Sequence, residues 1–143
     1  MGAGVAGACV VAWLVALSVY DVRERRLPNW LTVPGGLVIL GVAAATGHGV
    51  AAVWGAVGLA ALYLVVHLVA PGSLGAGDVK LAVGVGGLTG AFGYDVWVLA
   101  AIGAPLVTAA VAGVATLLRA EGAVPHGPSM CLSTAAALAL VVV

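Results

Sequence analysis

"VAAVWGAVGLAALYLVVHLVA" runs from Val50 to Ala70 and contains no Asp, Glu, Lys or Arg. A helix needs about 20 such residues to cross roughly 30 Å of hydrocarbon. The strands of a membrane β-barrel would alternate apolar and polar residues, whereas this run is continuously apolar. The segment therefore predicts a membrane-spanning α-helix.

The whole chain shares this character. It has 143 residues, of which 64% are hydrophobic and 7% are charged. Soluble domains are usually about 45–50% apolar and about 25% charged, so this chain lacks the residues for a polar surface. We expect an all-α, polytopic membrane protein with a single transmembrane domain over residues 1–143. The formal net charge of zero gives no electrostatic basis for nucleic-acid binding.

Breaks in the apolar runs predict about six transmembrane helices, over residues 2–20, 31–47, 50–70, 79–93, 96–118 and 129–143. Six spans place the loops 21–30, 71–78 and 119–128 on one side of the membrane. This side also holds all five basic residues, which are Arg23, Arg25, Arg26, Lys80 and Arg119. Basic residues stay cytoplasmic during insertion, so we expect both termini outside.

Two acidic residues lie at the cytoplasmic ends of predicted spans. Asp21 closes the first span and Asp78 opens the fourth, so the two lie at similar depth. Each has a structural alternative. Asp21 can be an N-cap or pair with Arg23 or Arg25, and Asp78 can cap its helix and pair with Lys80. Two carboxylates within reach of each other share a proton. One can then take a proton from water while the other donates to a substrate carbonyl, so the pair indicates hydrolysis.

The residues before Asp78 read "GAGD". Gly75 and Gly77 remove side-chain bulk where a substrate strand must approach the carboxylate, and they permit backbone angles that aim Asp78 inward. Further glycines follow in "GVGGLTGAFG", Gly84–Gly93, and allow close contact between helices.

"LPN" at Leu27–Asn29 predicts the start of a helix, since Pro28 restricts the residue before it. One of the three histidines, His48, His67 and His126, could orient a substrate or tune the acidic pair, but we expect all three to be interface or packing residues. Their spacing does not resemble a metal site, and we expect neither a metal nor a cofactor.

Three stretches together resemble the type IV prepilin peptidases, which are aspartic membrane peptidases of the GxGD type. They are "YDVRERRLPNW" (Tyr20–Trp30), "GAGDVKL" (Gly75–Leu81) and "VPHGPSM" (Val124–Met130). In the last, His126 stands where an apolar or aromatic residue is more usual in the family. The resemblance implies that Asp21 and Asp78 are catalytic, and that the site is shaped by Gly75, Gly77, Lys80, Pro28 and Asn29.

The resemblance also implies a client and a location. The substrate would be a prepilin or pseudopilin, whose basic leader lies in the cytoplasm and whose apolar helix lies in the membrane. The enzyme would be a multi-pass protein of the bacterial cytoplasmic membrane, in contact with lipid and with pilus or secretion assembly machinery. Long members carry an N-terminal segment with paired CxxC motifs and methylate the cleaved pilin. This chain resembles the short, peptidase-only form, so methyltransferase activity is not expected.

Other functions remain open at this stage. One is a preflagellin-type or other GxGD peptidase with a different client. Another is a small transporter or proton channel that uses Asp21 and Asp78 as a relay. A third is a non-catalytic assembly subunit of a secretion system.

Overall fold

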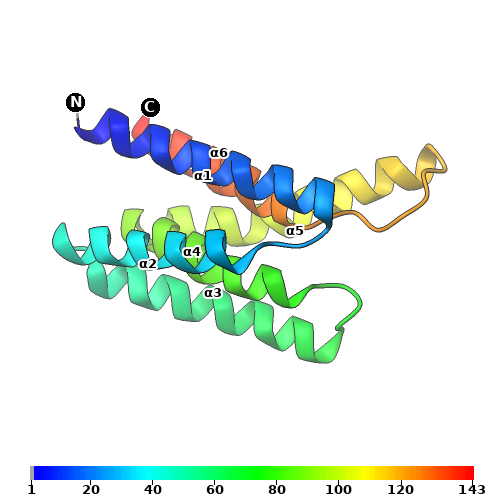
Figure 1. The fold of residues 1–143 in the computed structure, drawn as a ribbon, viewed down its shortest axis with the longest axis horizontal. Coiled ribbons are helices and arrows are strands. Elements are labelled where there is room, and N and C mark those ends of the chain that lie inside the picture. Colours follow the sequence, from blue (N-terminus) through cyan, green and yellow to red (C-terminus); the bar gives the residue numbers. More distant parts are fainter. Residues whose placement is uncertain (1) are drawn as a thin grey trace.

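Six α-helices form in residues 2–143, which is the part of the chain that the computed structural model describes (Figure 1). They are α1 (Gly2–Glu24), α2 (Asn29–Ala45), α3 (Gly49–Val69), α4 (Ala76–Phe92), α5 (Tyr94–Leu117) and α6 (Gly127–Val142). Each helix covers one of the predicted apolar segments with ends shifted by a few residues. The all-α prediction is confirmed.

Three of these helices, α1, α3 and α5, are long enough and apolar enough to cross a membrane. The apolar helices α2 and α6 are shorter, and α4 has 17 residues, which rise about 26 Å at about 1.5 Å per residue. Large apolar side chains such as Leu37, Trp54 and Leu106 are more than 60% exposed, as is expected of surfaces that face lipid. The chain is therefore a multi-pass membrane protein, and full spans for α2, α4 and α6 stay a prediction.

Prolines and glycines set the helix ends. Pro28 has extended backbone angles (φ −70°, ψ 136°) and immediately precedes α2, so the predicted helix start at "LPN" is confirmed. Pro128 lies in the first turn of α6, where its missing N–H is not needed. Gly93 joins α4 to α5 with φ 132°, a backbone angle that favours glycine.

The helices pack as two groups of three. In one group α4 packs chiefly against α3 and also against α2, and in the other α6 packs against α5 and α1. Figure 1 shows α1 and α6 together along the top of the molecule and α2 and α3 along the bottom. The groups meet mainly where α4 contacts α5 and α6.

Glycines bring α3 and α4 together. A Cβ atom added to Gly86 would collide with the backbone oxygen of Gly55, and one added to Gly55 would collide with that of Gly86. A Cβ atom on Gly90 would lie 2.9 Å from the Cα of Gly55. Small residues of this kind permit close helix contact in membranes, so α3 and α4 form the tightest pair in the bundle.

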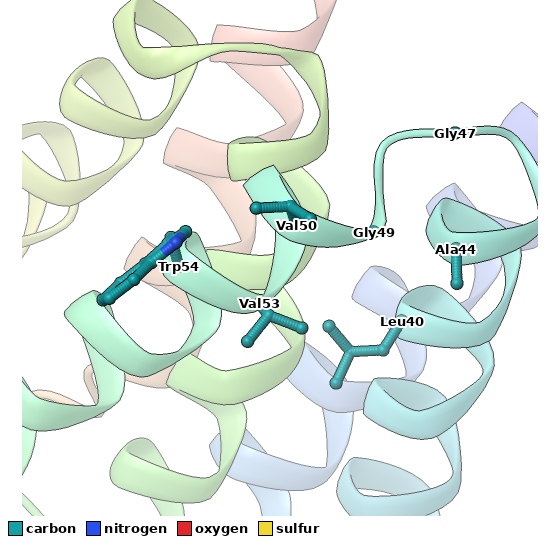
Figure 2. Close-up of a pocket in the computed structure, with 7 residues that line it drawn as sticks. All are labelled: Leu40, Ala44, Gly47, Gly49, Val50, Val53 and Trp54. Carbon is teal, nitrogen blue, oxygen red and sulfur yellow. The ribbon is translucent and has the colours of Figure 1, made fainter.

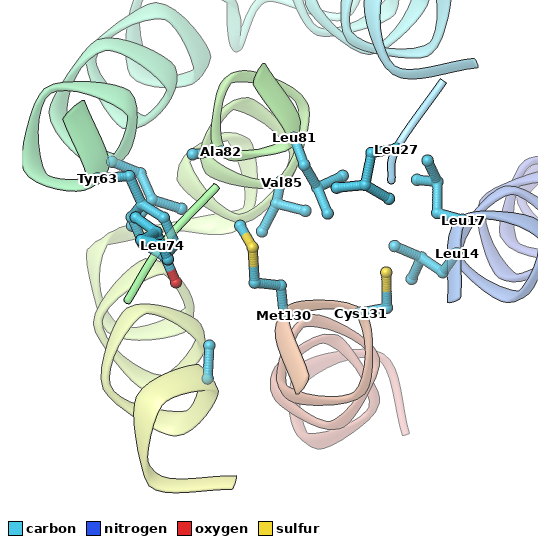
Figure 3. Close-up of a cluster of buried hydrophobic side chains, with 12 residues drawn as sticks. Leu14, Leu17, Leu27, Tyr63, Leu74, Leu81, Ala82, Val85, Met130 and Cys131 are labelled. Atoms are coloured by element: carbon cyan, nitrogen blue, oxygen red, sulfur yellow. The ribbon is translucent and has the colours of Figure 1, made fainter. Parts of the chain in front are cut away.

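One cluster of buried side chains connects the two groups (Figure 3). Leu14 and Leu17 of α1 meet Cys131 of α6, while Met130 of α6 extends toward Val85 of α4. The core therefore lies between α1, α4 and α6.

The turns divide between the two ends of the bundle. The segments 25–28, 70–75 and 118–126 lie at one end, and both termini lie at the other together with the turns at 46–48 and 93 (Figure 1). We call the first the loop end. It carries the five basic residues and is predicted to face the cytoplasm.

An apolar groove of about 640 Å³ lies between α2 and α3 at the opposite end (Figure 2). Its lining consists of Leu40, Ala44, Gly47, Gly49, Val50, Val53 and Trp54. No titratable side chain lines it, so we interpret it as a surface that contacts lipid.

Candidate active site

Asp21 lies near the end of α1 and is buried, with 7% of its surface exposed. Its Oδ2 accepts a hydrogen bond of 2.9 Å from the backbone N–H of Gly127, the first residue of α6. Because a Cβ atom on Gly127 would collide with this carboxylate, the two residues are in close contact. Within residues 2–143 the carboxylate forms no direct salt bridge. The Arg25 charge is nevertheless close enough to act on it, in line with the arginine alternative.

Asp78 lies in the first turn of α4 and is half-buried. Its Oδ2 accepts the backbone N–H of Gly75 at 3.2 Å, and its own N–H donates to the Gly75 carbonyl at 3.1 Å. The carboxylate thus caps the start of α4, as the structural alternative predicted. Lys80 does not pair with it, and donates instead to the Asn29 side chain at 2.8 Å.

The two aspartates come from different helix groups but lie at the same end. Among the described residues α1 and α4 make no close backbone contact, and they meet instead through the side-chain cluster around α6. Asp78 lies in the first turn of α4, before the continuously apolar part of that helix begins. Its burial, and then the charge of Asp21, raise the pKa of Asp78 to about 6. The charges therefore interact, and a proton on Asp78 is retained well above the usual range of an aspartate.

The two sequence stretches that carry the aspartates also contact each other. A Cβ atom on Gly77 would lie 3.3 Å from the Cβ of Leu27, which is buried. The bond from Lys80 to Asn29 joins the same two segments at the surface. Leu27 and Asn29 thus hold the start of α4 beside the start of α2.

The proposed backbone role of the two glycines was wrong. Gly75 has φ −78° and ψ 158°, which any residue can adopt, and Gly77 is helical without a positive φ. The reason for glycine at position 77 is its close approach to Leu27. At position 75 an added Cβ atom would make an ordinary contact of 3.6 Å with the Asp78 carboxylate.

Sequence reasoning missed a cluster of polar side chains beside Asp21. The imidazole of His126 bonds through Nε2 to the Tyr63 hydroxyl at 2.8 Å, and through Nδ1 to the Thr108 hydroxyl at 2.7 Å. Tyr63 comes from α3, Thr108 from α5, and His126 immediately precedes α6. The signal available in the sequence was the histidine itself, at an unusual position in "VPHGPSM".

These features define a helical membrane protein with two interacting carboxyl groups at one end of its bundle. The chain belongs to the type IV leader peptidase family, whose sequence model matches residues 8–143. No curated protein and no solved structure shows a significant match to it. The family consists of aspartic peptidases, and the resemblance of the three motifs is confirmed.

Proposed function

We propose that this protein is an aspartic endopeptidase that removes the basic leader from type IV prepilins or pseudopilins at the cytoplasmic face of a bacterial membrane. Asp21 and Asp78 are its catalytic pair, and residues 1–143 act as a single transmembrane peptidase domain. The observation that carries the proposal is the placement of two buried or half-buried carboxyl groups, one near the end of α1 and one at the start of α4, at the same end of the bundle in a member of the type IV leader peptidase family.

The different surroundings of Asp21 and Asp78 assign them different roles in peptide hydrolysis. Burial and the charge of Asp21 raise the pKa of Asp78 to about 6, so we assign the shared proton to Asp78 and the acceptance of a proton from water to Asp21. The water oxygen bonds to the scissile carbonyl carbon while Asp78 gives its proton to the carbonyl oxygen, which forms a gem-diol. Asp21 then passes its proton to the leaving nitrogen as the C–N bond breaks. A gem-diol proton returns to Asp78, and the new carboxyl group leaves with the leader.

The position of the pair supports the choice of substrate. A prepilin places its cleavage site between a basic leader and an apolar helix, which is the depth predicted for the loop end. Gly75 adds no side chain beside the Asp78 carboxylate, where a Cβ atom would lie 3.6 Å from its Oδ2. Lys80 and Asn29, bonded to each other, keep the adjacent helix starts in place.

The test is a set of single substitutions in which a carboxylate becomes an amide of the same shape. Asp21→Asn and Asp78→Asn are each co-expressed with a type IV prepilin, and leader removal is followed as a shift in gel mobility. We expect both variants to abolish processing. Asp95→Asn is the matched control, since Asp95 lies in the first turn of α5 at the opposite end of the bundle, and it should process normally.

Two outcomes would contradict the proposal. If both aspartate variants still process the prepilin, the pair is not catalytic. If the wild-type protein shows aspartate-dependent ion flux and yields no cleavage product, the pair serves transport instead.

A further inference from the structure

We propose that His126 is a positioning residue for the catalytic pair. Through hydrogen bonds to Tyr63 and Thr108 it fixes the start of α6, and the first N–H of α6 holds the Asp21 carboxylate. This inference rests on the proposed function, because it assigns His126 a role in the same peptidase reaction.

The side chain of His126 is held at both ring nitrogens. Tyr63 bonds to Nε2 and Thr108 to Nδ1, at 2.8 and 2.7 Å, and the Tyr63 ring lies against the imidazole with centroids 5.4 Å apart. Burial lowers the pKa of His126 below its ordinary value of 6.5, so the ring is neutral at pH 7. A neutral imidazole has one donor and one acceptor nitrogen, which two hydroxyl groups can satisfy together.

The backbone of His126 transmits this restraint to Asp21. Its carbonyl accepts the N–H of Met130 at 3.0 Å and so begins the α6 hydrogen-bond pattern. The peptide that joins His126 to Gly127 is planar and carries the N–H that bonds to Asp21 at 2.9 Å. A shift of His126 therefore turns the donor away from the carboxylate.

The contact leaves little space for such a shift. Gly127 is buried, and even a methyl group there would collide with the Asp21 carboxylate. A second bond between these segments, from the Arg25 guanidinium to the Ala123 carbonyl, lies at the exposed surface. His126 provides a half-buried connection, and it ties α3 and α5 to the segment that contacts α1.

The experiment uses substitutions that remove only the hydrogen bonds. Tyr63→Phe and Thr108→Val keep the shape of each side chain, and His126→Phe removes both bonds at once. With purified enzyme and a prepilin substrate, we expect His126→Phe to lower kcat about 10- to 100-fold, because small misplacements of reacting groups cost this much, while KM changes little. His48→Phe is the matched control, since His48 is exposed at the opposite end and its side chain makes no cap bond.

Rescue and non-additivity separate positioning from a general loss of fold. His126→Gln keeps a donor and an acceptor and should recover part of kcat. The double variant His126→Phe with Tyr63→Phe should be no slower than His126→Phe alone, since both changes break the same chain of contacts. Hydrogen exchange at the start of α6 should accelerate in His126→Phe and remain slow in His48→Phe.

The results distinguish the inference from the proposed function. Unchanged kcat and unchanged exchange in His126→Phe would overturn the positioning role even if the aspartate variants are inactive. Equal loss in His126→Gln and His126→Phe would also overturn it, because restoring a donor and an acceptor would then recover nothing and the loss would not depend on the hydrogen bonds. Normal processing by Asp21→Asn and Asp78→Asn would instead remove the proposed function itself.

Discussion

At the scale of single residues, the Asp21 carboxylate is confined by the start of α6. The Gly127 N–H donates to it, and the absence of a side chain at Gly127 makes room for it. Asp78, by contrast, is held by its own helix start through Gly75. The two carboxylates are therefore restrained by different segments of the chain.

Gly127→Ala should reduce both stability and processing. The new methyl group would overlap the carboxylate, and overpacking of this kind costs about 1–3 kcal/mol. Thermal unfolding in detergent and the prepilin mobility shift measure the two effects. Gly113→Ala is the control, since nothing lies within 4 Å of a Cβ atom there, and equal behaviour of the two variants would contradict the prediction.

Asp78 should carry an observable proton at mildly acidic pH. Its pKa of about 6 means that the carboxyl form dominates below that pH and is lost above it. Infrared difference spectra should show a protonated-carboxyl band that disappears as the pH rises through about 6 and that is missing in Asp78→Asn. In Asp21→Asn the midpoint should move to lower pH, because a like charge has been removed. A midpoint that does not move would show that the two groups do not interact.

The two candidate catalytic aspartates could be predicted from the sequence, but the groups that hydrogen-bond to them or pack beside them could not. Asp21 and Asp78 are rare ionisable groups beside apolar runs, and their positions alone select them. The donor to Asp21 is a backbone N–H 106 positions away, and every residue except proline has such a group. The contact of Gly77 with Leu27 could not be predicted either, because it depends on how the start of α4 packs beside the start of α2.

At the scale of helices, the close approach of α3 and α4 determines where Asp78 lies. Asp78 belongs to α4, and α4 is fixed most firmly by its glycine contact with α3. The sequence predicted the six helical segments because each is a long apolar run with Pro, Gly or charged residues at its ends. The sequence did not predict that α4 packs most closely against α3. The glycines of "GVGGLTGAFG" permit close contact with a neighbouring helix, but they do not specify which helix that is.

Gly86→Ala should separate α3 from α4. The added methyl group would meet the Gly55 backbone oxygen and the Leu59 Cβ, neither of which can move aside easily. We expect a loss of about 1–3 kcal/mol of stability and reduced processing, measured by thermal unfolding and mobility shift. Gly41→Ala in α2 meets nothing within 4 Å and should be neutral, so comparable losses in both variants would contradict the role assigned to this contact.

At the scale of the whole molecule, the ends of the bundle differ in charge. All five basic residues lie at the loop end with both catalytic candidates, and Asp95 lies at the other end. The six-helix connectivity fixes which segments share an end. The rule that basic residues stay cytoplasmic then predicts which end faces the substrate leader.

Cysteine labelling tests this orientation. In a Cys9→Ser background, which removes the exposed native cysteine, His48→Cys should react with an impermeant maleimide in intact cells. Ser73→Cys should react only after the cells are permeabilised, because its loop belongs to the opposite end. The reverse pattern would place the aspartates outside, where a cytoplasmic leader could not reach them.

The packing of α1 against α6 also sets the order in which the proposed site is completed during synthesis. Asp21 is synthesised early, yet the amide that holds it belongs to a residue made 106 positions later. A nascent chain therefore holds both aspartates before it has made the amide that restrains Asp21. The proposed site reaches its final arrangement only when the sixth helix has been inserted beside the first.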